Sequence, residues 1–373
     1  MLQNVSARLM RAVQESHTAT ARIDIVRGAA ITSFKAIDGV VTFDFDDTTR
    51  RSLDITFIDE SGRTFIDMER LTDPFTCSLK PYRGIDFSNN GSDVEWMGLG
   101  EYFTDRLEIL ETSEGVVQWR ISALDASSMC RTPLQFPVFI PGGVPGGEAI
   151  PQILRQVWPR MNFQIREGSW TMPPTLIDED KVPWDEAVRL AQASGQDLFI
   201  TRDGLCVMGS RPSNVSPRSN WDFVEGQNAT FWEPKRNKSS RLPNVVVVIG
   251  TNTLAPGVRG EAFDADPYSP TYVNGTYGRI VETYKSELVV VTEQAEAMAR
   301  NILNRRLGPA DEVEFFTTPI PFLDEADTIS VTRDRMGMNQ RQLLISHLEV
   351  PLLADDGMRV VGRRTVTSEG RAA

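Results

Sequence analysis

The stretch that decides the fold runs from Thr292 to Val331 and reads TEQAEAMARNILNRRLGPADEVEFFTTPIPFLDEADTISV. Its first half predicts a helix, because Thr292 is a good N-terminal cap and the pair Gly308-Pro309 is a strong stop signal. Apolar residues recur on one face of this helix at helical spacing: Ala295, Met298, Ile302 and Leu303. The sequence therefore predicts an amphipathic helix that packs one face on another element.

The second half of this stretch is extended and rich in β-forming residues. Pro319 and Pro321 lack the amide hydrogen that a central strand needs, so we expect an interruption there. One helix beside strands that continue to the C-terminus predicts a helix packed on a small β-barrel or sheet. This arrangement is more typical of assembly modules than of cofactor-binding enzymes.

The N-terminal third of the chain shows a different periodicity. From Arg22, apolar residues alternate with polar ones for about a hundred residues, which indicates β-strands. Turn signals such as Asp38-Gly39 and Ser61-Gly62 separate the strands. The inward-facing residues are predicted to be Ile23, Ile25, Val41, Phe43, Phe45, Leu53, Ile55 and Phe57. This pattern predicts an antiparallel β-domain of about one barrel or sandwich.

The glycine-rich segment 141–147 marks a change to mixed structure. Helices are expected at 148–158 and 183–193, and a hairpin at 198–208 turns at Asp203-Gly204. The predicted fold class is mainly β with an α/β insert: two antiparallel β-barrel-like domains that flank a small mixed domain. The predicted divisions are an N-terminal helical arm at 1–20, a first β-barrel-like domain at 21–140, a small α/β domain at 148–210, a linker or long loop at 211–241, and a second β-barrel-like domain at 242–373 with one helix at 292–307.

Composition narrows the classes of protein. The chain has 373 residues, enough for two or three domains, and 40% of them are hydrophobic. A net charge of -12 argues against a protein that binds nucleic acid through its phosphates. No apolar run approaches the roughly 20 residues that span a bilayer, and the first 20 residues do not resemble a secretory signal. Cys77, Cys130 and Cys206 are odd in number and far apart, so we expect buried thiols rather than disulfides or a metal site.

One motif suggests catalysis. Asp44, Asp46 and Thr48 match the D-x-D-x-T pattern in which haloacid-dehalogenase-like phosphatases use an aspartate nucleophile and Mg²⁺. That chemistry needs a parallel strand followed by a helix. Here Arg50 and another alternating strand follow the motif, so a polar hairpin end is favoured over a catalytic site.

Other candidate sites are weaker. The chain has only two histidines, His17 and His347, which leaves few bases for a triad and no usual zinc site. The glycine loop 142–147 lacks the Lys and Ser/Thr of a P-loop, and a flexible linker is favoured there. Asp324, Glu325 and Asp327 are the weak candidates for a cation site, against the more common solvated acidic corner. We therefore assign no catalytic residue and no cofactor.

The order of elements resembles the tail-hub (minor tail, baseplate hub) proteins of long-tailed bacteriophages, of the type that infect actinobacteria. The resemblance rests on patterns over most of residues 20–367 and not on an invariant signature. It is carried by the segments 79–87, 93–103 and 121–125, by the helix 295–307, and by the segments 319–323, 327–331 and 350–352.

The resemblance implies a homotrimer in which the two β-barrel-like domains of each subunit form a ring of six similar units. It implies as partners the distal tail protein, the tape-measure protein and receptor-binding or fibre proteins. The implied location is the virion tail tip, assembled in the host cytoplasm, with genome DNA passing through the lumen without specific binding. We add the hypothesis that part of the negative charge lines this channel and repels DNA phosphates. The alternatives are a metal-dependent hydrolase or phosphatase that uses Asp44 and Asp46, and a carbohydrate-binding β-protein.

Overall fold

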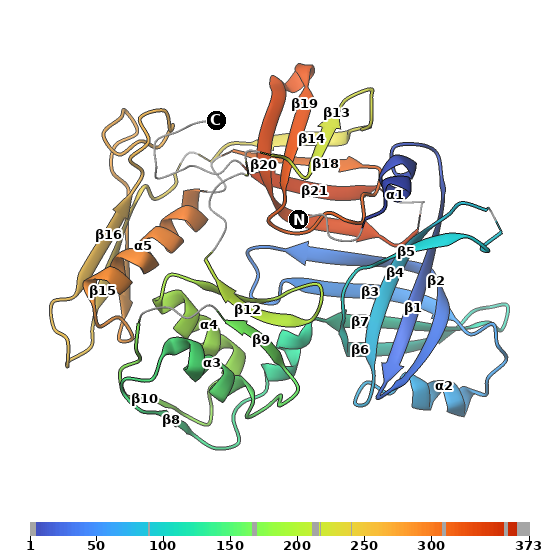
Figure 1. Ribbon diagram of the computed structural model, residues 1–373, viewed down its shortest axis with the longest axis horizontal. Helices are drawn as coiled ribbons and strands as arrows, with labels where there is room; N and C mark the ends of the chain where they lie inside the picture. Colours follow the sequence, from blue (N-terminus) through green and yellow to red (C-terminus); the bar gives the residue numbers. More distant parts are fainter. Residues whose placement is uncertain are drawn as a thin grey trace.

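One continuous sheet of 13 strands runs through both β-rich parts of the molecule (Figure 1). The structure is a computed structural model, and it describes residues 5–88, 90–165, 170–210, 216, 218–239, 241–307, 311–353 and 357–363. The strands belong to two groups, which we call the first β-unit and the second β-unit. Smaller sheets with helices complete the fold, so the predicted class, mainly β with α/β parts, is confirmed.

The first β-unit contains seven strands and two short helices. Its strands pair antiparallel in the order β5-β4-β1-β2-β3-β7-β6. An isolated bridge between Leu79 and Tyr102 links β4 to the residue before β6, so the strands curl toward closure without a ladder there among the described residues. The elements are α1 (Ala7–Ala12), β1 (Thr18–Arg27), β2 (Ala30–Asp44), β3 (Arg51–Ile58), α2 (Phe65–Leu71), β4 (Ser78–Asp86), β5 (Val94–Gly98), β6 (Phe103–Glu111) and β7 (Val117–Leu124).

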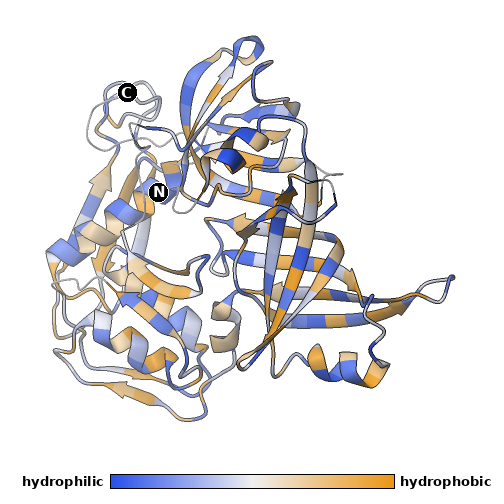
Figure 2. Cartoon of the chain, turned by 45° about the vertical axis from the view of Figure 1, so that its right-hand side comes forward, coloured by the Kyte–Doolittle hydropathy of each residue, from blue (hydrophilic) through white to orange (hydrophobic). Residues whose placement is uncertain are grey.

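The alternation seen in the sequence sets the inside of this unit. Each residue of the predicted inward face is buried, and Ile23, Phe43 and Phe57 are fully so. Figure 2 shows the corresponding alternation of hydrophobic and hydrophilic residues along these strands. A period-two pattern places one set of side chains on each face, so burial of one face fixed the register.

The second β-unit is assembled from two distant parts of the chain. Its strands pair in the order β14-β18-β21-β20-β19-β13. The predicted linker or long loop at 211–241 is corrected here, because it contains β13 and β14. Phe223 in β13 is fully buried, with its ring 5.3 Å from that of Phe315. The elements are β13 (Trp221–Val224), β14 (Trp232–Asn237), β18 (Glu312–Thr317), β19 (Thr328–Arg333), η3 (Asp334–Met336), β20 (Met338–Pro351) and β21 (Met358–Arg363).

The two β-units are joined through the long strands β2 and β20. These strands pair antiparallel from Val40 with Pro351 to Asp44 with His347. Buried residues of both units form one continuous hydrophobic cluster. The β-units are therefore halves of one body, because separating them would break a strand ladder and expose that cluster.

The small α/β unit follows the first β-unit and has its own core around the fully buried Trp184. The glycine loop 142–147 is an ordered part of it and not a free linker: Gly143 N–H donates to Met172 O, and Gly146 lies so close to Trp170 that a Cβ would be 2.0 Å from the indole ring. The elements are η1 (Ala126–Cys130), β8 (Val138–Ile140), α3 (Gly146–Leu154), β9 (Asn162–Ile165), β10 (Thr175–Ile177), α4 (Pro183–Ala193), β11 (Asp197–Ile200) and β12 (Leu205–Gly209).

The predicted second β-domain at 242–373 also needs a correction. Its first half forms a separate three-stranded sheet, in the order β16-β15-β17, with a core of its own under α5. We call this part the β15–β17 unit; it is inserted between β14 and β18. The predicted helix is present with the predicted bounds. The elements are β15 (Val245–Gly250), β16 (Arg259–Phe263), β17 (Val281–Ser286) and α5 (Thr292–Leu307).

Among the described residues, none of the helices combines the length and the apolar character that crossing a membrane requires.

Candidate functional site

The D-x-D motif lies at a hairpin end. Asp44 is the last residue of β2, and residues 45–50 turn directly into β3, which pairs antiparallel with β2. Asp44 accepts a hydrogen bond from the Asp46 N–H at 2.9 Å, and Asp46 forms a 2.8 Å ion pair with Arg363. The cavity beside Asp46 measures about 20 Å³, roughly the space of one water molecule. The strand-then-helix context of the phosphatases is therefore absent at this motif.

His347 binds two carboxylates. Its Nδ1 lies 3.3 Å from Asp44 Oδ2 and its Nε2 lies 3.0 Å from Glu349 Oε1, so both ring nitrogens donate when the imidazole is charged. These hydrogen bonds raise the pKa of His347 to about 9. The hydrogen bond from His347 lowers the pKa of Glu349 to about 2, although burial acts to raise it. Arg359, 2.7 Å away, lowers this pKa further. His347 is thus part of a chain of ion pairs between β2, β20 and β21.

The acidic corner faces an arginine. Arg51 Nη2 lies 2.9 Å from Asp324 Oδ1 and 2.5 Å from Glu325 Oε2, while Arg202 lies 3.6 Å from the other Asp324 oxygen. Asp327 turns inward and accepts the Asp324 N–H at 3.0 Å. The Arg51 guanidinium therefore occupies the position beside these carboxylates that a cation would take. Among the described residues, no group of three His, Cys, Asp or Glu side chains is arranged to hold a metal ion.

Burial and the neighbouring arginine charges shift the pKa values of these carboxyl groups in opposite directions. Burial alone would raise the pKa of Asp324, but the charges of Arg51 and Arg202 outweigh it and lower that pKa below its usual range. Burial raises the pKa of Glu325 above its usual range, and the Asp324 charge adds to the rise despite Arg51. Burial also raises the pKa of Asp327 to about 6. The corner is therefore a contact that shares charge with Arg51, in which the Glu325 side chain is buried and Asp324 keeps 31% of its side chain exposed.

A second arginine extends this contact to the other units. Arg50 pairs with Asp197 in β11 at 2.9 Å, and Arg305 in α5 reaches the same carboxylate at 3.1 Å. We call the whole set the junction cluster; its members are Arg50, Arg51, Asp197, Arg202, Arg305, Asp324 and Glu325.

The junction cluster ties the four units together. Arg51 also donates to Ile200 O at 3.3 Å, and Arg202 donates to Leu323 O at 2.7 Å. The guanidinium of Arg50 lies 4.2 Å from the ring centroid of Phe199, and that of Arg51 lies 4.6 Å from the ring centroid of Phe43. Sequence reasoning singled out the carboxylates but missed the arginines; the adjacent pair Arg50-Arg51 before a buried strand was the available signal.

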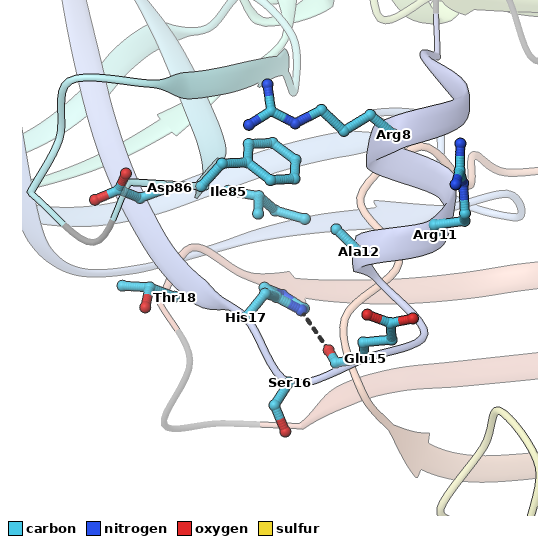
Figure 3. Close-up of a pocket in the computed structure, with 10 residues that line it drawn as sticks. Arg8, Arg11, Ala12, Glu15, Ser16, His17, Thr18, Ile85 and Asp86 are labelled. Carbon is cyan, nitrogen blue, oxygen red and sulfur yellow. Dashed lines mark hydrogen bonds between the residues drawn. The ribbon is translucent and has the colours of Figure 1, made fainter.

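A cavity of about 640 Å³ lies between α1 and β4 (Figure 3). Its lining carries both signs of charge, and several side chains are already engaged. Arg8 pairs with Asp93 at 2.5 Å and stacks on Phe87, while His17 Nδ1 lies 2.9 Å from Glu15 O. The two contacts of Arg8 hold α1 against the strands of the first β-unit, which is a packing role.

The three cysteines are free and buried, as predicted. Burial raises the pKa of Cys77 to about 11 and that of Cys130 to about 12, and it raises the pKa of Cys206 as well. Their thiols are therefore protonated and inert at neutral pH.

The fold is similar to that of solved phage tail proteins. A tail protein from Neisseria meningitidis covers 92% of this chain and 95% of its own length, with a TM-score of 0.62 and 12% identity. A prophage MuSo2 tail protein from Shewanella oneidensis covers 92% of this chain and 98% of its own length, with a TM-score of 0.61 and 13% identity. An Escherichia coli type VI secretion component, described as similar to the T4 bacteriophage tail proteins gp27 and gp5, covers 94% of this chain and 79% of its own, with a TM-score of 0.52 and 9% identity. No protein-family model matches the sequence, and neither does any curated protein.

Proposed function

We propose that this chain is a structural protein of a bacteriophage tail and forms the hub of the tail tip or baseplate. The observation that carries the proposal is the joining of two β-units into one sheet through β2 and β20, with the ion pairs of the junction cluster beside it. This architecture suits a rigid connector. The fold similarity to tail proteins, which extends over 92% of the chain, supports the same role.

In the proposed assembly three copies form a ring, and the two β-units of each copy supply six similar units around it. Such a ring matches a sixfold tail tube on one face and threefold symmetry on the other. The proposed partners are the distal tail protein, the tape-measure protein and receptor-binding or fibre proteins. The proposed place is the virion tail tip, assembled in the host cytoplasm, and the phage type is the one that infects actinobacteria.

The proposed role is not enzymatic. The residues of the one catalytic motif are used within the fold: Asp44 binds His347, and Asp46 binds Arg363. Asp324 and Glu325 are likewise held by Arg51. These contacts favour a structural protein over a hydrolase with Asp44 as nucleophile.

The ring would also form part of the DNA ejection channel. With a net charge of -12, the chain has enough acidic residues to line a lumen that repels DNA phosphates and lets the genome pass without specific binding. A map of the assembled ring tests this point directly. A lumen with a neutral or basic surface would contradict it.

Mass measurement of the purified protein tests the hub itself. Light scattering should give three times the chain mass of 41.7 kDa, and negative-stain images should show rings. A monomer with Mg²⁺-dependent phosphatase activity that Asp44→Asn abolishes would instead establish the enzyme.

A further inference from the structure

Two exposed surfaces of opposite charge lie on different units of the molecule. The first is the end of the β6–β7 hairpin, which we call the acidic tip; its residues are Glu108, Ile109, Leu110, Glu111, Glu114 and Val116. Ile109, Leu110 and Val116 are each roughly 40% exposed, unusual for apolar residues on a strand pair. Arg106 pairs with Glu108, while Glu111 and Glu114 make no ion pair within the described chain.

The second surface is the face of the β15–β17 unit that α5 leaves uncovered. Val246 and Val248 point into the core under α5, so Val245, Val247 and Ile249 point the other way. Phe263 and Val281 flank Val245 in register, and both are exposed. We call this surface the basic face; its charged residues are Arg259, Glu261, Arg279 and Lys285.

The charges on the basic face are complementary to those on the tip. Arg259 pairs with Glu261 at 3.7 Å, whereas Arg279 and Lys285 are exposed and have no ion pair among the described residues. Two cations without an ion pair and the exposed Phe263 and Val281 thus match the two unpaired carboxylates and the apolar residues of the tip. Such complementarity steers association and excludes wrong partners.

The strand edges of the main sheet also favour the β6–β7 hairpin as a contact surface. The edge strand β14 contains Pro234 and a register shift between Trp232 and Lys235, features that discourage added strands. In the first β-unit the edge strand β5 is attached to the N-terminal arm, because the Ser6 hydroxyl donates to Glu95 at 2.8 Å. By contrast, the nine residues of β6 pair only with β7 within the described chain. The one further bridge nearby joins Leu79 to Tyr102, the residue just before β6. The β6–β7 hairpin is therefore the available contact surface of the first β-unit.

We propose that copies of this chain associate head to tail, with the acidic tip of one copy on the basic face of the next. In Figure 1, drawn with the longest axis horizontal, β15 and β16 lie at the left end while β6 and β7 lie on the right-hand side, so one copy cannot satisfy its own surfaces. A contact between two different surfaces generates a ring when the rotation closes. The inference rests on the proposed hub role, since it names the surfaces through which the ring closes.

Charge reversal tests the contact. Glu111→Lys with Glu114→Lys should weaken trimer formation about tenfold at low salt, and Arg279→Glu with Lys285→Glu should do the same. The chain with all four changes restores opposite charges and should assemble within about threefold of the wild type. Analytical ultracentrifugation over a concentration series measures each equilibrium.

A matched control reverses charges elsewhere. Asp178→Lys with Glu179→Lys changes two exposed acids on the small α/β unit and should leave assembly unchanged. If the four-change chain does not regain assembly, or if this control loses assembly equally, the head-to-tail contact is overturned. A wild-type trimer would still support the hub in that case. A wild-type protein that stays monomeric at every concentration contradicts the proposed ring as well.

Crosslinking gives a second readout that does not depend on charge. The native cysteines are buried, so cysteines introduced by Val116→Cys and Val281→Cys are the reactive ones. A short bis-maleimide should join separate chains when the two single variants are mixed, and not when either is alone. Crosslinking of Val116→Cys with itself, or none in the mixture of assembled protein, overturns the proposal.

Discussion

At the scale of single residues, buried arginines determine how the units of this chain meet. Arg51 has 2% of its side chain exposed, yet it carries a full charge and faces Asp324 and Glu325. A buried charge is costly unless it is paired, so the three side chains depend on one another. The sequence showed the acidic corner but not its partners, because Arg51 lies 273 positions away from Asp324.

Arg51→Met should destabilise the protein by about 3–5 kcal/mol, because it removes the charge that faces the buried Glu325 carboxylate and the half-buried Asp324 carboxylate. Urea denaturation measures the loss. Arg106→Met is the matched control, since its ion pair with Glu108 is exposed and should be worth below about 1 kcal/mol. Equal losses in the two variants would show that the junction cluster adds no stability.

His347 gives the fold a defined pH dependence. Its pKa is about 9 in the folded protein and about 6.5 when unfolded. A raised pKa means that the stabilisation is fully present below pH 6.5 and is lost as the pH rises through about 9. The difference in unfolding free energy between the wild type and His347→Gln should therefore shrink over that range.

Nuclear magnetic resonance measures the same titration directly. The chain has two histidines, so His347→Gln identifies the signal of His347. Glu349→Gln removes one of the two carboxylates and should lower the midpoint of that signal. A wild-type midpoint at or below the usual value would refute the ion-pair chain.

At the scale of elements, local signals predicted what local interactions control. The helix α5 has the predicted bounds because a cap, a face of apolar residues and a stop signal all lie inside its own sequence. The break between β18 and β19 falls at Pro319 and Pro321, as expected. The strands β13 and β14 were missed because their pairing partners, β19 and β18, lie roughly 75 to 110 residues later and the segment is rich in turn-forming residues.

Gly260 sets the distance between α5 and β16. A Cβ at this position would lie 2.3 Å from the Glu296 nitrogen and 2.5 Å from the Ala295 carbonyl carbon, and backbone atoms in a helix cannot move aside cheaply. Gly260→Ala should therefore cost about 1–3 kcal/mol in thermal or urea denaturation.

Gly209 provides the comparison for this substitution. It ends β12 with open space around its missing side chain, so Gly209→Ala should change the stability by less than about 1 kcal/mol. If Gly260→Ala were as stable as Gly209→Ala, the close packing of α5 on β16 would be refuted.

At the scale of the whole molecule, two β-units behave as one body and the β15–β17 unit is separate. Buried residues from both β-units belong to one cluster, whereas Val246, Val248 and the inner face of α5 form another. Cooperative units of unfolding follow such continuous cores.

Hydrogen exchange can show this division. Leu348→Ala, at a fully buried position of β20, should speed exchange in β2 and β3 as well as in β20 and β21, and leave β15–β17 unchanged. Val248→Ala should have the reverse effect, with faster exchange in β15–β17 and α5 alone. A uniform effect of both variants across the chain would show that the β15–β17 unit has no independent core.

The sequence by itself determined the mainly β class, the inward faces of the strands, the helix at 292–307 and the buried thiols, because alternation, caps and turn residues act over a few positions. Only the tertiary structure decided that β2 pairs with β20, that 211–241 contributes two strands, and that Asp324 and Glu325 face Arg51. These contacts join residues that lie roughly 75 to 310 positions apart. Such pairings depend on which surfaces remain to be covered once local elements have formed, and no short pattern specifies them.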